Sequence, residues 1–268
     1  MNIYSMPDLT LKGQVMGYKY SFMQGECADR SGNIWVTSVF NNGSSFYGQL
    51  IKLAHDGTLL SSMYFPYGFP NSCAVDLTTG NLAVTEVPYS GPGAVVIYAG
   101  GGGPGKPIMN PQMPFVSYDG YDSSGHLWVD GTDDKGKFIL SSCGASSCTT
   151  IPITGGTIDG PGFVQYAVGE KTWYIEDNGD AGCDSTNASC IYPVSNKGVL
   201  GTPISLTDTH GQPCDVYQGV IANGKSRVLA GPGRCGRHFL VARWNFPAGG
   251  PWTNHTSDSG LGAAISQK

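Results

Sequence analysis

Polar side chains recur at a similar place in five related segments, and together they could bind a metal ion. The set combines carboxylate and amide groups: Glu26, Asn71, Asp119, Gln165 and Asp215. Calcium prefers hard oxygen ligands of this kind, and carboxylates brought together repel one another unless a cation or protons intervene. We therefore predict a calcium site formed by Glu26, Asn71, Asp119 and Asp215. The alternative is that these side chains hold ordered water and bind backbone amides.

Two histidines could supply acid–base chemistry beside such an ion. His210 precedes the fifth segment, and His238 follows it in a predicted loop that also contains Arg237. A general base and its partner beside a metal can activate water for hydrolysis, so His210, His238 and Asp215 are the catalytic candidates. Arg237, Gln165 and Tyr217 are the candidate substrate-binding residues. The alternative is that both histidines are surface residues on solvated loops.

The segments that carry these residues form an internal repeat. Residues 26–36, 73–84 and 119–129 each have the form strand, Asp-x-x-(x)-Gly-(Asn/His), strand, and weaker copies cover 162–175 and 214–225. Cys27 and Cys73 are 46 positions apart, as are Cys73 and Asp119. Asp29, Asp76 and Asp122 are expected to cap tight turns, with glycine in the left-handed position. Weaker outer hairpins lie between the copies, and four strands per unit of this length predict a β-propeller blade.

We predict an all-β, six-bladed propeller that forms a single domain over residues 1–268. Five inner hairpins are explicit, and an outer hairpin at residues 2–15 has no inner hairpin before it. A strand at residues 260–266 would complete a closing blade shared by both ends of the chain, so that no sheet edge stays free. A five-bladed ring is the alternative.

The propeller architecture predicts where the candidate site should lie. Inner strands all begin on one face, so residues just before each inner strand should converge on the central axis. Loops that join the second and third strands should emerge on the same face, and we expect Glu86, Asp130 and Glu176 there. Exposed aromatic residues either line the mouth, as a sugar- or ester-binding surface, or pack between blades: Phe46, Tyr47, Tyr67, Phe69 and Tyr89.

Composition excludes several classes of partner. The 268 residues include 40 glycines and 17 prolines, charged residues are only 13%, and the net charge is −5. Without a basic stripe to neutralise phosphates, nucleic acid is not expected as a partner. No apolar run approaches the roughly 18 residues that a membrane helix needs. We expect a monomer that acts on a small-molecule substrate.

Eight cysteines indicate disulfides. Cys143 and Cys148 enclose one short loop and Cys183 and Cys190 another, while Cys214 and Cys235 flank the fifth hairpin. Cys27 and Cys73 head adjacent inner strands and are either bridged or reduced. A zinc site would need C-x₂-C pairs or nearby histidines, which are missing. Disulfides predict a secreted or periplasmic protein.

The repeated Asp-x-x-Gly-Asn-Leu-x-Val pattern resembles NHL-repeat propellers and the regucalcin/gluconolactonase-like superfamily. Residues 24–29, 73–85 and 246–250 also resemble a group of bacterial secreted propellers. The resemblance implies a calcium ion in the central tunnel, with Glu26 at the family's glutamate position and Asn71 at an asparagine position. Asp119 and Asp215 match by position only, and the family's second asparagine has no clear counterpart.

Two functions from different classes follow. The first is a calcium-dependent hydrolase of lactones, esters or phosphotriesters that works at the tunnel mouth. The second is a non-catalytic extracellular propeller that binds a glycan, a peptide or a protein, since fold does not dictate function. A propeller-type polysaccharide lyase that uses Arg237, His238 and Tyr217 is a third alternative.

Overall fold

The computed structural model describes residues 1–5, 8–15, 21–41, 43–88, 91–179, 190–222, 228–236, 238–257 and 264. Within these ranges the regular structure is β-strand, apart from one 3-10 turn, η1 (Ala99–Gly101). Short strands are expected from a sequence in which glycine and proline interrupt apolar runs. In this part of the chain, no helix has the length and hydrophobicity to span a membrane.

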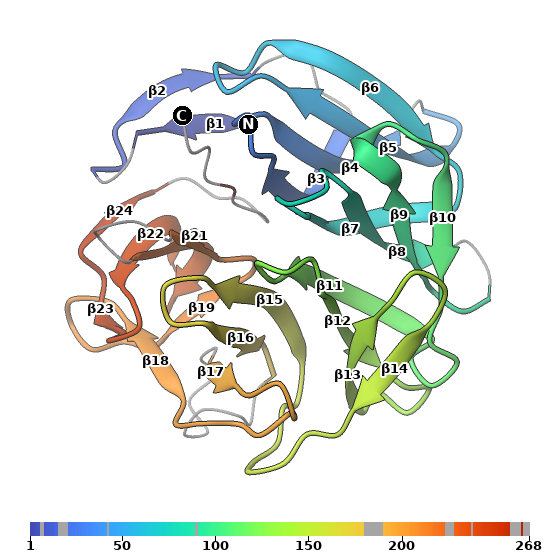
Figure 1. Cartoon of the computed structure of the whole chain (residues 1–268). Coiled ribbons are helices and arrows are strands. Elements are labelled where there is room, and N and C mark those ends of the chain that lie inside the picture. Colours follow the sequence, from blue (N-terminus) through green and yellow to red (C-terminus); the bar gives the residue numbers. More distant parts are fainter. Residues whose placement is uncertain are drawn as a thin grey trace.

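Five sheets of four or five strands are arranged around a central axis as the blades of a propeller (Figure 1). Blade 1 contains β3 (Ser21–Ala28), β4 (Ile34–Asn41), β5 (Phe46–Leu53) and β6 (Leu59–Phe65). Blade 2 contains β7 (Gly68–Val75), β8 (Leu82–Pro88), β9 (Val95–Tyr98) and β10 (Gly105–Ile108). Blade 3 contains β11 (Phe115–Tyr121), β12 (Leu127–Thr132), β13 (Phe138–Cys143) and β14 (Cys148–Ile151).

The last two blades are less regular. Blade 4 contains β15 (Pro161–Ala167), β16 (Thr172–Asp177), β17 (Cys190–Val194), β18 (Ile204–Thr207) and, paired in parallel with β18, β23 (Gly250–Pro251). Blade 5 contains β19 (Cys214–Val216), β20 (Val220–Ala222), β21 (Val228–Cys235), β22 (His238–Asn245) and β24 (Asn254–Thr256). Its inner strand is interrupted, because β19 and β20 both pair with β21.

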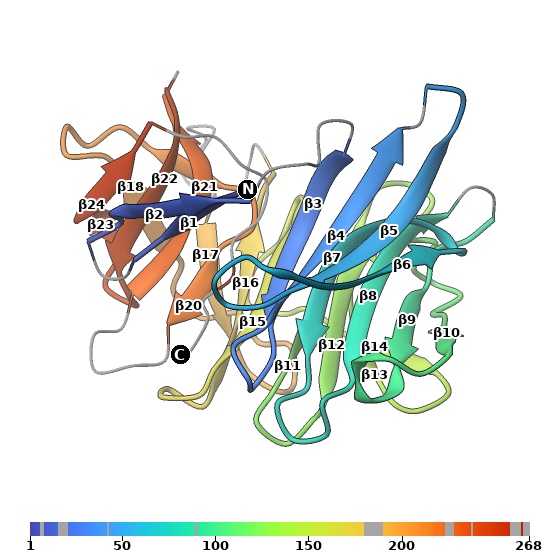
Figure 2. The same cartoon turned by 90° about the horizontal axis from the view of Figure 1, so that it is seen from above.

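The propeller is confirmed, but the count of six full blades is not. The expected amino-terminal hairpin forms a two-stranded sheet of β1 (Asn2–Tyr4) and β2 (Leu11–Gln14). Met1 and Val15 pack against blade 1, and Asn254 of blade 5 donates a hydrogen bond to the Asp8 carbonyl. The hairpin therefore lies between blades 5 and 1 (Figures 1 and 2). The strand predicted at 260–266 lies outside the described residues, except for Ala264, so five blades fit what is described.

The aspartates predicted to cap the inner turns do so. Asp29 Oδ1 accepts the amides of Ser31 and Asn33, both at 2.9 Å, and Asp76 and Asp122 bind their own turns in the same way. The turn glycines Gly32, Gly80 and Gly125 have φ between 77° and 82°. Only glycine adopts this conformation without strain, which explains the repeated Asp-to-Gly spacing.

Three disulfides are resolved, and they join pairs that the sequence analysis named: Cys27–Cys73, Cys143–Cys148 and Cys214–Cys235. The first connects the inner strands of blades 1 and 2. Cys190 is also disulfide-bonded, while Cys183 lies outside the described residues. Disulfides of this number are compatible with an extracellular or periplasmic protein.

Candidate functional site

Each inner strand of blades 1 to 4 contains a β-bulge, and the candidate residues lie around it. The pairing with the second strand shifts between Met23 and Glu26, and at the matching place in β7, β11 and β15. The inner strands β3, β7 and β11 thus begin four or five residues earlier than the sequence analysis assumed. Glu26 and Asp119 therefore lie inside their strands rather than before them. They hold the same register position, opposite Val36 and Val129 respectively.

The second strand of each blade supplies a polar side chain to the bulge. Thr37 Oγ1 accepts the amide of Gly25 at 2.7 Å and donates to the Asn71 carbonyl of blade 2 at 2.8 Å. Thr85 repeats both contacts one blade further on, with the Ser72 amide and the Ser117 carbonyl. A buried backbone group without a partner is costly, so these threonines stabilise the bulges and join neighbouring blades.

Asp130 and Glu176 occupy the threonine position in blades 3 and 4. Asp130 Oδ1 accepts the Tyr118 amide at 2.9 Å, and Glu176 Oε2 accepts the Phe163 amide at 3.4 Å. Both carboxyl groups are fully buried. The expectation that Glu86, Asp130 and Glu176 lie on loops is therefore wrong, because all three belong to second strands, β8, β12 and β16.

Buried carboxyl groups near the axis resist ionisation. Burial raises the pKa of Asp119 to about 7, although the Ser72 hydroxyl and the Ala74 amide lie close enough to oppose the shift. Burial also raises the pKa of Asp130 well above its usual range, and the negative charges of Asp119 and Glu176 add to the effect. These three groups therefore form one electrostatically coupled cluster.

Asp119 is distinctive because its carboxyl group is buried and the nearby Ser72 hydroxyl and Ala74 amide are not in full hydrogen-bond geometry with it. Asp119 is only 5% exposed, and neither of its carboxyl oxygens has a hydrogen-bond partner. Buried polar atoms are nearly always paired, so an exception calls for a reason such as a catalytic role or a bound ion. Asp119 is the strongest candidate for chemistry in the described residues.

Groups from three other blades meet near Asp119. Gln218 of blade 5 donates from Nε2 to Ser72 Oγ of blade 2 at 3.2 Å, and Gln218 Oε1 has no partner. Gly25 of blade 1 completes the contact: a Cβ there would lie 2.5 Å from the Asn71 carbonyl and 3.1 Å from Gln218 Oε1. We name Asp119, Ser72, Gln218 and Gly25 the axial cluster. The sequence analysis missed Gln218, which lies between β19 and β20, where the inner strand of blade 5 is interrupted.

Glu26 lies beside Gly25 but in a different electrostatic setting. Burial raises its pKa to about 7, and the charged amino group of Met1 opposes the shift. Glu26 is thus close enough to the chain's amino terminus to feel its charge. Asn71 Nδ2 donates to the Ser117 carbonyl at 2.7 Å, which fixes the orientation of that side chain.

Three other predicted residues have their own partners outside the axial cluster. Asp215 is bound by Arg234, at 2.8 Å from Nη2 and 3.2 Å from Nε. The His210 side chain is 83% exposed and lies 3.8 Å from Asp208. Gln165 Oε1 accepts the Ile221 amide at 2.6 Å, which ties blade 4 to blade 5.

Three further predictions concern the fifth blade. Burial raises the pKa of Tyr217, whose surroundings include both Arg234 and Asp215. Arg237 lies outside the described residues, and of His238 only the backbone, at the start of β22, is described.

The donor chemistry of the axial cluster fits a hard cation in part. Asp119 offers two unpartnered oxygens and Gln218 a third, and oxygen-only donors suit calcium. Asp215, however, is engaged by Arg234. Among the residues with described placement, no three histidine, cysteine, aspartate or glutamate side chains are grouped closely enough to hold a metal.

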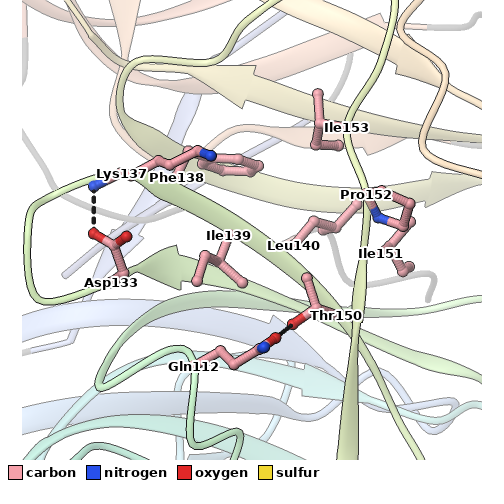
Figure 3. A pocket seen from close by; sticks show the side chains of 10 residues that line it. All are labelled: Gln112, Asp133, Lys137, Phe138, Ile139, Leu140, Thr150, Ile151, Pro152 and Ile153. Carbon is pink, nitrogen blue, oxygen red and sulfur yellow. Dashed lines mark hydrogen bonds between the residues drawn. The ribbon is translucent and has the colours of Figure 1, made fainter.

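A separate surface hollow of about 440 Å³ lies on blade 3 (Figure 3). Its walls come from β13, β14 and the segment that follows, including Phe138, Leu140 and Pro152, and Gln112 closes one side by binding Thr150 at 2.7 Å. It contains no residue of the axial cluster and none of the predicted site residues.

Comparison with known proteins supports the fold. No protein-family model and no curated protein matches this chain. Among solved structures, a chain of a nidogen/laminin complex matches with a TM-score of 0.70 at 9% identity, covering 98% of this chain and 93% of that one. The calcium-binding protein regucalcin from Agrobacterium tumefaciens matches with a TM-score of 0.59 at 14% identity, over 91% of this chain and 78% of that one. A gluconolactonase from Xanthomonas campestris gives 0.60 at 13%, over 92% and 80%.

These likenesses confirm the regucalcin-like and NHL-like propeller architecture that the repeat indicated. Sequence identities of 9–14% support a shared fold and do not support a shared function. The neighbours also differ in what they do, since one is a calcium-binding protein, one is a gluconolactonase and one belongs to a complex between proteins.

Proposed function

We propose that this chain is a hydrolase of lactones or related esters, with phosphotriesters as a further substrate class, and that Asp119 is its acid–base group. The observation that carries the proposal is the buried Asp119 carboxyl group with two unpartnered oxygens and a pKa raised to about 7. A general base works best when its pKa lies near the operating pH. The structural likeness to a gluconolactonase agrees with this reaction class.

The reaction follows from what Asp119 can do as a carboxylate. It accepts a proton from a water molecule, whose oxygen forms a bond to the substrate's carbonyl carbon. When the bond from that carbon to the leaving alcohol oxygen breaks, the protonated Asp119 returns its proton to the alcohol. Ser72 and Gln218 orient the carboxyl group and its water, because both lie beside it at the axis.

A calcium ion would be held by oxygens of Asp119 and Gln218, and Glu26 and Asn71 remain the further donors that the sequence predicts. Such an ion would supply polarisation of the substrate's carbonyl or phosphoryl oxygen. The likeness to a calcium-binding regucalcin supports testing this ion first. The disulfides favour a secreted or periplasmic location for the enzyme.

Turnover of p-nitrophenyl acetate, an aldonolactone and a phosphotriester tests the proposal, with EDTA or added Ca²⁺ in parallel assays. Asp119→Asn should reduce kcat/KM by about 100-fold or more, as loss of a general base does. Asp134→Asn is the matched control, since Asp134 is an exposed carboxylate on the β12–β13 turn of the same blade. A wild-type protein inactive on all three substrates, or an Asp119→Asn variant as active as the control, contradicts the proposal.

A further inference from the structure

Blade 1 carries a row of aromatic rings across its strands. Phe40 of β4 pairs with Tyr47 of β5, and their ring centroids are 5.0 Å apart. Tyr47 also contacts Tyr64 of β6, at 6.1 Å. Residues that pair across antiparallel strands share a face of the sheet, so the three rings lie on one side of the blade. We name Phe40, Tyr47 and Tyr64 the aromatic ladder; its strands β4, β5 and β6 are neighbours in the sheet of blade 1.

The ladder reaches the surface at Tyr64, while Phe40 and Tyr47 are half-buried. The Tyr64 residue is 58% exposed, whereas its neighbour in sequence, Phe65, is fully buried against blade 2. None of the three rings belongs to a hydrophobic cluster of the described structure. At the same end of the blade, on its other side, Phe22 and Phe46 form a second exposed pair, 56% and 52% exposed with centroids 6.5 Å apart. Aromatic surface concentrated in this way marks a binding site.

Strands β4, β5 and β6 place no charged side chain on the ladder's face. No lysine, arginine, aspartate or glutamate occurs between Arg30 and Lys52, or between Asp56 and Asp76. These intervals contain β4, β6 and most of β5. Side chains on the ladder's face include Gln49, which pairs with Tyr64, and the exposed Ser62, which pairs with Ile51. The surface therefore offers flat rings beside amide and hydroxyl groups.

Such a surface selects a ligand that is neutral, has apolar C–H faces and carries hydroxyl groups at its edges. The electron-rich face of an aromatic ring attracts weakly positive C–H groups, while amides and hydroxyls bind alcohol groups. A charged ligand would find no side chain of opposite charge on this face of the three strands. A protein partner would also lack the arginine contacts that stabilise the centre of many protein–protein interfaces. We propose that the aromatic ladder of blade 1 binds a neutral oligosaccharide, independently of the axial cluster.

Isothermal titration calorimetry tests this with four neutral hexasaccharides, namely cello-, laminari-, malto- and chitohexaose, and with hexagalacturonate as an acidic comparison. We expect at least one neutral sugar to bind and hexagalacturonate not to bind. Tyr64→Ala and Tyr47→Ala should each weaken that binding by about tenfold or more, since a stacked ring contributes on the order of 1.4 kcal/mol. Phe239→Ala is the matched control, because Phe239 is 54% exposed on blade 5 and has no described ring contact.

Three outcomes overturn the inference: no neutral hexasaccharide binds, binding survives both tyrosine substitutions, or Phe239→Ala weakens it equally. Sedimentation velocity adds a further check. A wild-type dimer that Tyr64→Ala converts to a monomer assigns the ladder to contact between two copies of the chain instead. Circular dichroism and melting curves verify that each variant is folded, and Asp119→Asn should bind the sugar as the wild type does.

Discussion

Gln218 and Ser72 form a hydrogen bond across the centre of the propeller, although 146 residues separate them. Their blades, 5 and 2, are not neighbours in the ring (Figure 1). The bond therefore fixes blade 5, whose inner strand is interrupted, relative to the regular first three blades. It also places an unpartnered amide oxygen near Asp119, which has two unpartnered oxygens of its own. The candidate site depends on this meeting of blades.

Stability should rise as pH falls from 8 to 5. The pKa values of Asp119, Glu26 and Glu86 are each raised to about 7 in the folded protein, so the folded state binds protons that the unfolded state has released. This contribution is complete below the unfolded pKa and is lost as pH rises through 7. Differential scanning calorimetry should show a higher Tm at pH 5.5 than at pH 8, and Asp119→Asn should reduce the difference. A Tm independent of pH over this range would show that the carboxyl groups ionise normally.

Gly25→Ala should destabilise the protein by about 1–3 kcal/mol, as overpacking of a core does. The added Cβ would lie 2.5 Å from the Asn71 carbonyl and 2.9 Å from Ser72 Cα, both backbone atoms that cannot turn aside. Gly13→Ala is the control, since a Cβ at that position meets nothing within 4 Å. Urea unfolding measures both variants. Equal stability for the two would mean that the blades are less tightly joined at Gly25 than described.

Asp215→Asn should have little effect on the reaction. Asp215 forms an ion pair with Arg234, whose side chain is 44% exposed, and exposed pairs contribute about 0–1 kcal/mol. We expect kcat/KM for ester hydrolysis to stay within about threefold of the wild type, a loss well below 1.4 kcal/mol. If Asp215→Asn abolishes turnover while remaining folded, Asp215 belongs to the reaction centre and the axial cluster is incomplete as defined.

Removal of the Cys27–Cys73 disulfide should cost more stability than removal of Cys143–Cys148. The two bridges span 46 and 5 residues. In the chain-entropy account the longer loop contributes about 4 kcal/mol and the shorter about 2 kcal/mol. Paired Cys→Ala variants, unfolded in urea, compare them directly. The reverse order would indicate that packing at the cysteines outweighs loop closure.

The sequence predicted the repeated features and missed the irregular ones. The Asp-to-Gly spacing identified the turns at Asp29, Asp76 and Asp122, because an aspartate caps the turn amides and a glycine adopts the positive φ that the turn requires. The β-bulges have no recognisable sequence pattern, so the positions of Glu26 and Cys27 within their strand could not be predicted. In the structure the residue of blade 2 that matches Glu26 in register is Cys73, not Asn71.

The site was harder to predict than the fold, for a physical reason. Thr37 and Asp130 differ in chemistry, yet both hold a bulge amide, so the shared role is visible only in the structure. Asp215 is the second residue of β19, and its carboxylate accepts hydrogen bonds from Arg234, a partner that the sequence pattern did not indicate.

The pH dependence of ester hydrolysis tests the central claim, that Asp119 is the acid–base group of the site. With Asp119 as the base, kcat/KM for p-nitrophenyl acetate, measured in EDTA so that no cation lowers the pKa of Asp119, should rise with pH through a midpoint near 7 and then level off. In Asp119→Asn this rise should disappear along with most of the activity. A wild-type profile with no inflection near 7, or a variant that retains both the inflection and the rate, would contradict the account.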